Sequence, residues 1–346
     1  MWMEADERER KLRDSPLLIK DEALTNYVHG VLCRTVGDDR CKGVRIYVLE
    51  IPAFNADMAP NGSMTVWSGL LLRVHNEGEL GAVLGHEFGH FELRHSLAAF
   101  KHKRSSTDAL AWLSVLGGAN QSFALLQLSI IGSMFRYDRD QEREADLQGL
   151  KYLASSPYPA QAAVDVWKTA MAEADATLVG RGRKPHQHYN AGFFDDHPTS
   201  LERATFLADA AAKVNHNGDP AAAEYRTAMA KYLPRFLSAQ VERNDFGGTE
   251  YILNGLASTS GWTGELLFAR GELYRLRGNP RDLVSAAQFY GQAIAAGYTA
   301  PDAHRNLGLA LLRTGQVTEG KQALQDYLKL DPNASDAKAI AALMSN

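Results

Sequence analysis

The sequence predicts a mainly α-helical protein with a small β-sheet, followed by a second domain of helical repeats. Three observations carry this prediction. Apolar residues recur at a spacing near 3.6 along most of the chain, as in amphipathic helices. Only two short segments near the N-terminus have the composition of strands. From residue 264 the pattern fits a repeat of about 34 residues, the length of a tetratricopeptide unit.

The composition fits a folded protein of two domains. The chain has 346 residues, which at roughly 100–200 residues per domain indicates two, and we place them at 1–215 and 216–346. Apolar residues make up 45% of the chain and charged residues 23%, so large-scale disorder is not expected. The net charge of −4 argues against a nucleic-acid partner, because nucleic-acid-binding domains usually carry a basic surface.

The N-terminal part predicts a helix followed by two strands. Residues 4–34 have charged residues first and then apolar residues at helical spacing. Segment 44–51 alternates and is rich in β-branched residues, and 64–67 is a second short strand. The backbone of an edge strand can pair with an extended peptide, so 64–67 is the expected edge for any polypeptide substrate.

Helices are expected over 79–100, 139–153 and 159–176, with a loop over 180–196. Between the first two helices, 109–135 contains no charged residue and is long enough to span a bilayer, which takes about 20 residues. Polar residues interrupt this segment, so we expect a buried or membrane-surface helical hairpin that gives at most peripheral membrane contact. A true membrane span is the alternative.

Two cysteines, Cys33 and Cys41, flank a turn-like stretch. In an exported protein they could form a disulfide, whereas in a cytosolic protein they would be free thiols. The N-terminus has no signal peptide. The protein is therefore expected to be either cytosolic or exported with its signal removed.

Paired helices are predicted for the C-terminal part. Segment 301–334 places Leu307 and Gly308 at the paired positions of the tetratricopeptide template, and 264–300 fits with three inserted residues. Segment 222–260 could be a third, degenerate unit. A generic helical bundle is the alternative interpretation.

The strongest chemical signal is the HExxH pattern of His86-Glu87-Phe88-Gly89-His90. It lies in a predicted helix, where residues i and i+4 share a face, so both imidazoles can reach one Zn²⁺. Glu87 is adjacent and could take a proton from a water molecule whose pKa the zinc lowers. The bare motif also arises by chance, so its assignment as a zinc site depends on the residues around it.

A third metal ligand is needed. The metzincin pattern would place histidine at position 96, where this chain has Ser96, and His95 is one position off and is expected to point elsewhere. Glu142 and Asp146 stand at i and i+4 on the next predicted helix, so one carboxylate could bind metal while the other supports a ligand histidine. An exposed acidic helix face is the alternative, and Glu144 is expected to be a solvated charge.

Gly81, Gly85 and Gly89 recur every four residues along the motif helix. Each is roughly 0.8–1.0 kcal/mol less favourable than alanine in a helix interior. The stripe therefore predicts that another element, for which 139–153 is the candidate, packs very close to it.

These residues together resemble the zinc metallopeptidases of the HtpX and CAAX-prenyl-protease type, a branch of the gluzincins. The resemblance covers about residues 45–205. Besides the HExxH motif it rests on Phe54-Asn55-Ala56, Pro60-Asn61-Gly62, Ser68-Gly69-Leu70, Glu79-Leu80, Arg94-His95, 139–146, and His197-Pro198 followed by Arg203. It implies a zincin-like domain with one zinc ion bound by His86, His90 and Glu142.

The resemblance also implies roles for four further residues. Glu87 would act as general base and acid, and Asp146 would orient a zinc-bound histidine. His197 and Arg203 would lie near the cleft, where they could stabilise the oxyanion or gate the site.

A peptidase domain of this type followed by tetratricopeptide repeats resembles the periplasmic peptidase-chaperones. The resemblance implies a zinc-dependent endopeptidase that acts on unfolded or misassembled polypeptides in envelope quality control. The repeats would recruit a protein partner or substrate, and the location would be periplasmic or otherwise exported, with the cytoplasm as the alternative. Two rival functions are a latent peptidase that acts mainly as a chaperone through its repeats, and a membrane-embedded processor of lipidated peptides.

Overall fold

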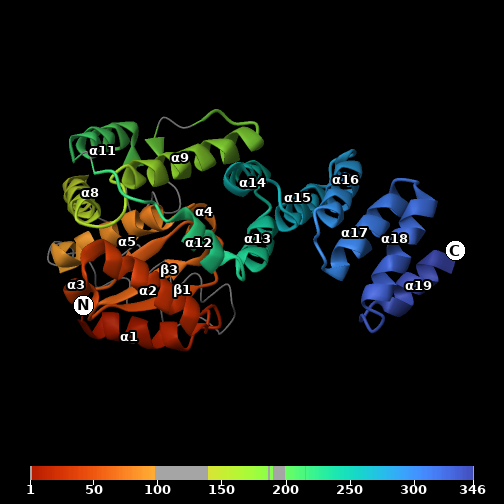
Figure 1. Cartoon of the computed structure of the whole chain (residues 1–346), viewed down its shortest axis with the longest axis horizontal. Coiled ribbons are helices and arrows are strands. Elements are labelled where there is room, and N and C mark those ends of the chain that lie inside the picture. The colour runs from red at the N-terminus through yellow and green to blue at the C-terminus, as the bar shows by residue number, and fades with distance from the viewer. Residues whose placement is uncertain (1, 98–138, 186–187, 190–198, 215, 346) are drawn as a thin grey trace, which may run out of the picture. The chain divides into compact units, whose positions relative to one another are not determined.

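The computed structural model describes residues 2–97, 139–185, 188–189, 199–214 and 216–345 (Figure 1). These residues are mainly helical with a small three-stranded sheet, as the sequence predicts. They fall into two compact units, Met1–Ala174 with His186–Ala230, and Asp175–Pro185 with Lys231–Asn346. None of the helices described is long and apolar enough to cross a bilayer, and segment 109–135 lies outside the described residues.

The N-terminal segment forms two helices, so the prediction of continuous helix over 4–34 is wrong. Helix α1 spans Trp2–Arg13 and α2 spans Glu22–Val36. The break contains Pro16, which disfavours helical geometry at the residue before it. Helix α2 then restarts at Asp21, whose carboxylate accepts hydrogen bonds from the backbone N–H groups of Ala23 and Leu24 at 3.0 and 3.3 Å.

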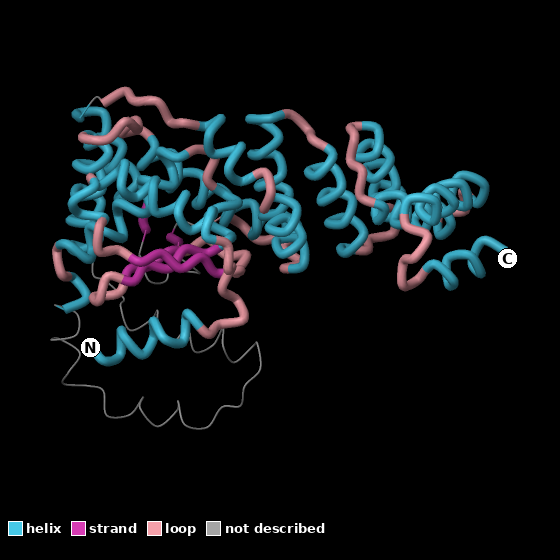
Figure 2. Tube along the Cα trace, turned by 60° about the horizontal axis from the view of Figure 1, so that its bottom comes forward, coloured by secondary structure: helices cyan, strands magenta, loops and turns pink. Residues whose placement is uncertain are grey.

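The small sheet has the strand order β1-β3-β2. Its strands are β1 (Arg45–Leu49), β2 (Ala56–Met58) and β3 (Ser63–Trp67), and Figure 2 shows α1 on one side of them. Strand β3 pairs parallel with β1 and antiparallel with β2. The expected substrate edge at 64–67 is therefore wrong, because β3 is the central strand and both of its edges are hydrogen-bonded.

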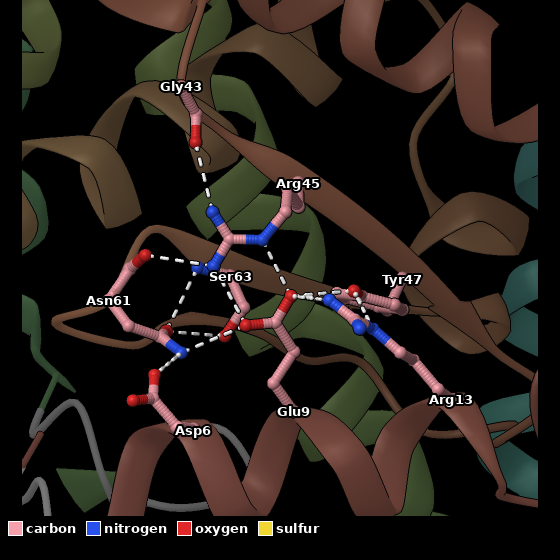
Figure 3. A network of polar contacts seen from close by, with 8 residues as sticks. All are labelled: Asp6, Glu9, Arg13, Gly43, Arg45, Tyr47, Asn61 and Ser63. Atoms are coloured by element: carbon pink, nitrogen blue, oxygen red, sulfur yellow. Dashed lines mark hydrogen bonds and ion pairs between the residues drawn. The ribbon is translucent and has the colours of Figure 1, made fainter. Parts of the chain in front are cut away.

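A polar network centred on Glu9 fixes α1 to the sheet (Figure 3). Arg45 on β1 donates two hydrogen bonds to the Glu9 carboxylate, at 2.6 and 2.7 Å. Tyr47, Arg13 and Asn61 each donate one more, at 2.7 to 2.9 Å. The hydrogen bonds from Arg45, and then from Tyr47 and Arg13, lower the pKa of Glu9 to about 2 against the opposing effect of burial.

Acid should therefore weaken the attachment of α1. The fold favours ionised Glu9, so its contribution to the free energy of unfolding is complete above about pH 4.5 and is lost as the pH falls toward 2. One pKa unit corresponds to about 1.4 kcal/mol, and because Arg13 and Arg45 are partly exposed we expect about 1–2 kcal/mol in total. In urea denaturation, Glu9→Gln should lose this amount at pH 7 and respond less to acid between pH 5 and 3.

The exposed Asp14 offers a matched control beside the same helix. Asp14→Asn should keep the stability and the acid response of the unmodified chain. An acid response in Glu9→Gln as large as that of the unmodified chain would contradict the assignment.

Further helices follow the sheet among the described residues of the first unit. They are α4 (Ser68–Arg73), α5 (Glu77–Glu92), α8 (Arg139–Ala154), α11 (Leu201–Val214) and α12 (Ala222–Met229), together with α9 (Ala162–Gly180) as far as Ala174. The helix expected over 79–100 ends early at Glu92. The loop expected over 180–196 contains the short strand β4 (His188–Tyr189), which pairs antiparallel with β5 (Thr199–Ser200).

Cys33 and Cys41 form a disulfide, which is one of the two alternatives that the sequence left open. It joins α2 to the short helix α3 (Asp38–Cys41). The bond closes a loop of few residues, so it fixes the end of α2 locally.

The second unit contains the helices α13 (Leu233–Glu242), α14 (Phe246–Ser260), α15 (Gly264–Arg277), α16 (Asp282–Ala295), α17 (Pro301–Arg313), α18 (Val317–Leu330) and α19 (Ala337–Ser345). Helices α15 and α16 pack as a pair, as do α17 and α18. A Cβ on Gly308 would lie 2.9 Å from the carbonyl oxygen of Gly320, so these two glycines allow the second pair its close approach.

Candidate metal centre

The motif helix α5 begins at a well-capped N-terminus. The side-chain oxygen of Asn76 accepts a hydrogen bond from the N–H of Glu79 at 2.8 Å, and the Glu79 carboxylate accepts one from the N–H of His75 at 2.8 Å. Burial raises the pKa of Glu79 to about 7. The cap fixes the start of the helix, and from there the 3.6-residue period sets where the motif side chains point.

Three predicted ligands converge. His86 and His90 come from α5 and Glu142 comes from α8, and all three are buried. The two Nε2 atoms lie 3.1 Å apart, and oxygens of the Glu142 carboxylate lie 3.6 Å from Nε2 of His86 and 3.4 Å from Nε2 of His90. These separations are those of donors arranged around a single small cation.

The donor set fits zinc in both chemistry and dimensions. Two imidazole nitrogens and one carboxylate oxygen form a typical catalytic zinc site, which keeps the fourth position for water or substrate. With zinc–ligand bonds of about 2.0–2.1 Å, tetrahedral donors lie about 3.4 Å from one another. The observed separations of 3.1 to 3.6 Å match that value. His86, His90 and Glu142 could therefore hold one zinc ion.

Small residues bring the two ligand helices together. A Cβ on Gly89 of α5 would lie 3.2 Å from the carbonyl oxygen of Ala145 on α8. A Cβ on Gly149 of α8 would lie 3.3 Å from the backbone nitrogen of His86. The absence of side chains at both positions lets α8 approach closely enough for Glu142 to reach the histidines.

The prediction of close packing by 139–153 is confirmed for part of the glycine stripe. Gly89 faces α8, and Gly85 lies between α8 and α2. Gly81 instead faces α2, where a Cβ would lie 2.5 Å from the hydroxyl oxygen of Thr35. The motif helix is thus enclosed by two helices, of which the sequence indicated one.

Each ligand histidine has a second polar contact on the side away from the ligand cluster. The Nδ1 atom of His86 lies 3.1 Å from a carboxylate oxygen of Asp146, which is buried. Asp146 stands one helical turn after Glu142 on α8, so the i, i+4 spacing places both carboxylates beside the same histidine. A carboxylate beside Nδ1 can orient a ligand ring and leave its Nε2 available for a metal.

The partner of His90 is His95, so the expectation that His95 points elsewhere is wrong. The Nδ1 atoms of the two rings lie 2.9 Å apart, and His95 is buried. Arg94 has a φ of 56°, in the left-handed region, so the chain turns after α5 and His95 lies against His90. Nothing in the sequence marks this turn, because Arg94 is neither glycine nor asparagine.

The far side of His95 contacts Glu144, which the sequence suggested was only a solvated charge. Nε2 of His95 lies 3.1 Å from a carboxylate oxygen of Glu144. A carboxylate accepts, so His95 donates from Nε2, and in the neutral imidazole its Nδ1 then accepts. His90 then donates from Nδ1, and its Nε2 is left unprotonated and able to bind a metal.

Of the three remaining predicted site residues, the structure describes the side chain of one. Glu87 is buried on α5, and Trp167 of α9 packs edge-on against His86, with ring centroids 5.7 Å apart. His197 lies outside the described residues. Arg203 belongs to α11, but its side chain is not among those described.

The chain is similar in sequence to known metalloproteases. The family model of Peptidase family M48 matches residues 22–211, which is more than half of the chain. Metalloprotease YcaL of Escherichia coli is 34% identical over 158 residues, covering 45% of this chain and 57% of that protein. The Beta-barrel assembly-enhancing protease of the same organism is 27% identical over 165 residues, covering 44% of this chain and 34% of that protein.

A further relative is Metalloprotease LoiP of Escherichia coli, which is 30% identical over 159 residues, 45% of this chain and 58% of that protein. The matched region thus spans between a third and three fifths of these relatives. It includes both ligand helices, and zinc is the metal on which peptidases of this family depend. The chain belongs to Peptidase family M48.

Proposed function

We propose that this chain is a zinc-dependent endopeptidase that hydrolyses peptide bonds of unfolded or misassembled polypeptides. The observation that carries the proposal is the convergence of His86 Nε2, His90 Nε2 and the Glu142 carboxylate in a buried site. These three residues would bind one zinc ion per chain. Membership of Peptidase family M48 supports the same chemistry.

The bound zinc would supply a Lewis acid for the scissile carbonyl and the attacking water. Glu87 stands next to a ligand histidine and would accept the proton of that water as general base. It would then return the proton to the leaving amine as general acid. Asp146 and His95 would hold the two ligand rings in place, and we propose that His197 and Arg203 stabilise the oxyanion or gate the site.

An extended substrate would pair with β2, the edge strand next to β3. Asn55 and Ala59, on either side of the centre of β2, form their backbone hydrogen bonds with β3. The alternation of a strand then directs the backbone groups of Ala56 and Met58 to the other edge. No strand pairs with that edge among the described residues. Pairing through the backbone suits polypeptides of varied sequence.

Removing the imidazole of His95 should weaken zinc binding by about 10–100-fold, the usual effect of losing a residue that orients a metal ligand. The Nδ1 atom of His95 is an acceptor that fixes the tautomer of His90. Competition with a chromophoric chelator would measure the affinity of His95→Ala. His95→Asn, whose amide oxygen can accept the same hydrogen bond, should recover part of the loss.

Glu144, which contacts His95, provides a control with a smaller expected effect. Glu144 is 64% exposed, so Glu144→Gln should change the zinc affinity by no more than a few-fold. Equal affinities in His95→Ala and the unmodified chain would show that His95 only fills space.

We further propose that the helical region 216–346 acts as tetratricopeptide-like repeats that recruit a protein partner or substrate. The close pairs α15–α16 and α17–α18 support this role. A relative is named for the assembly of β-barrels, which supports a place in envelope protein quality control. The disulfide favours an exported, periplasmic protein. Any contact with a membrane would be peripheral and made through 109–135.

A latent peptidase that acts mainly as a chaperone is the second candidate. It is favoured by the burial of Glu87, which is only 1% exposed. In that case deletion of the repeats from about residue 264 should abolish function, while Glu87→Gln should retain it. The reverse result supports the endopeptidase.

A further inference from the structure

Three helices of the second unit line a groove of about 530 Å³. Helices α13, α15 and α17 each contribute residues spaced three or four apart, so each presents a single face to it. The floor is apolar and includes Pro234 of α13 and Phe268 and Leu276 of α15, each of which has exposed surface. The groove therefore offers an apolar surface on the side of the helix pairs where successive first helices meet.

The rim of this groove is acidic. Glu242 of α13, Glu265 of α15 and Asp302 of α17 line it, and none of the three forms an ion pair with a described residue. Glu242 and Asp302 are exposed and Glu265 is half-buried. The rim thus presents three carboxylates, one from each helix, outside the ion pairs of the described residues; Arg305 is close enough to act on Asp302, but it is paired with Asp336.

The other charges in the groove are already satisfied. Glu272 is paired with Arg275 at 2.5 Å and also accepts hydrogen bonds from Tyr290 and Asn306, at 2.5 and 2.7 Å. This carboxylate and its arginine therefore neutralise each other. The charge available to a ligand is that of the three rim carboxylates, and it is negative.

Two of the rim carboxylates, Glu265 and Asp302, act on the same side chain, that of Tyr298. Burial, and then the charges of Asp302 and Glu265, raise the pKa of Tyr298 to about 12. The negative potential is thus concentrated where α15 and α17 meet, beside the apolar floor.

We propose that this groove binds a polypeptide segment in which lysine or arginine alternates with large apolar residues. This inference rests on the proposed partner-binding role of the repeats and gives that partner a chemistry. Apolar side chains would cover the floor formed by Pro234, Phe268 and Leu276, and the intervening cations would pair with the rim carboxylates. A neutral apolar segment would desolvate those carboxylates without pairing them, and an acidic segment would be repelled.

The test uses a fluorescein-labelled peptide of alternating leucine and lysine, with fluorescence anisotropy as the readout. The full chain carries Glu87→Gln, so the peptide is not cleaved during the measurement. We expect saturable binding that weakens with added salt, and no binding of the matched peptide that has glutamate in place of lysine. Glu265→Gln and Asp302→Asn should each weaken binding by roughly two- to fivefold, and the double variant by about tenfold.

Glu319→Gln is the matched control, because Glu319 is exposed on α18 and does not line the groove. It should bind as the Glu87→Gln chain does, and circular dichroism should show equal helix content in all variants. Equal binding of the lysine and glutamate peptides would overturn the proposal, as would unchanged binding in the Glu265 and Asp302 double variant. Neither outcome depends on whether the chain is an active peptidase.

Discussion

Replacing Glu87 with glutamine should reduce the cleavage of an unfolded model protein by about 10²–10⁴-fold, the usual contribution of a positioned general base. Glutamine keeps the shape of the side chain but cannot accept the proton of the attacking water. The measurement compares the zinc-loaded unmodified chain with Glu87→Gln, using a reduced and alkylated protein as substrate and the chain itself as a second one.

The zinc content of both chains is the control for this comparison. Glu87 is not one of the three converging ligands, so Glu87→Gln should bind zinc as the unmodified chain does. Cleavage by Glu87→Gln at the original rate would show that another group moves the proton. Absence of cleavage by either chain would favour the latent peptidase.

Replacing Glu142 with glutamine should lower the zinc affinity by more than a hundredfold. Loss of a group that only orients a ligand already weakens metal binding by about 10–100-fold, and Glu142 would be a ligand itself. The substitution also removes the negative charge that offsets the metal, at a site with no exposed surface. Chelator competition would measure the affinity, and peptide cleavage should be lost in parallel.

Glu144→Gln is the control on the same helix, because it makes the same chemical change at an exposed position two residues away. It should keep zinc binding within a few-fold of the unmodified chain. If Glu142→Gln retained zinc as Glu144→Gln does, Glu142 would not be the third ligand.

Local spacing made much of the site predictable. The interval between His86 and His90 is one helical turn, and so is the interval between Glu142 and Asp146. Helix geometry alone therefore places each pair on one face. That the two faces meet depends on the close packing of α5 and α8, which the glycine stripe indicated in part.

Features that depend on distant or unusual backbone geometry were not predictable. Strand β2 contains only three residues, so no alternation marks it, and without it β3 looks like an edge strand. The position of His95 depends on the left-handed conformation of Arg94, which no residue type in the sequence indicates. The break near Pro16 was missed because apolar residues resume at helical spacing on its far side.

The two ligand helices have a consequence for how the fold is maintained. His90 and Glu142 are far apart in the sequence, so a zinc ion held by both would act as a cross-link that the unfolded chain cannot form. By linkage, free zinc at 1,000 times its dissociation constant would add about 4.1 kcal/mol to the stability of the first unit. The melting temperature of that unit would therefore rise with the free zinc concentration, and zinc starvation would lower the stability of the enzyme as well as its activity.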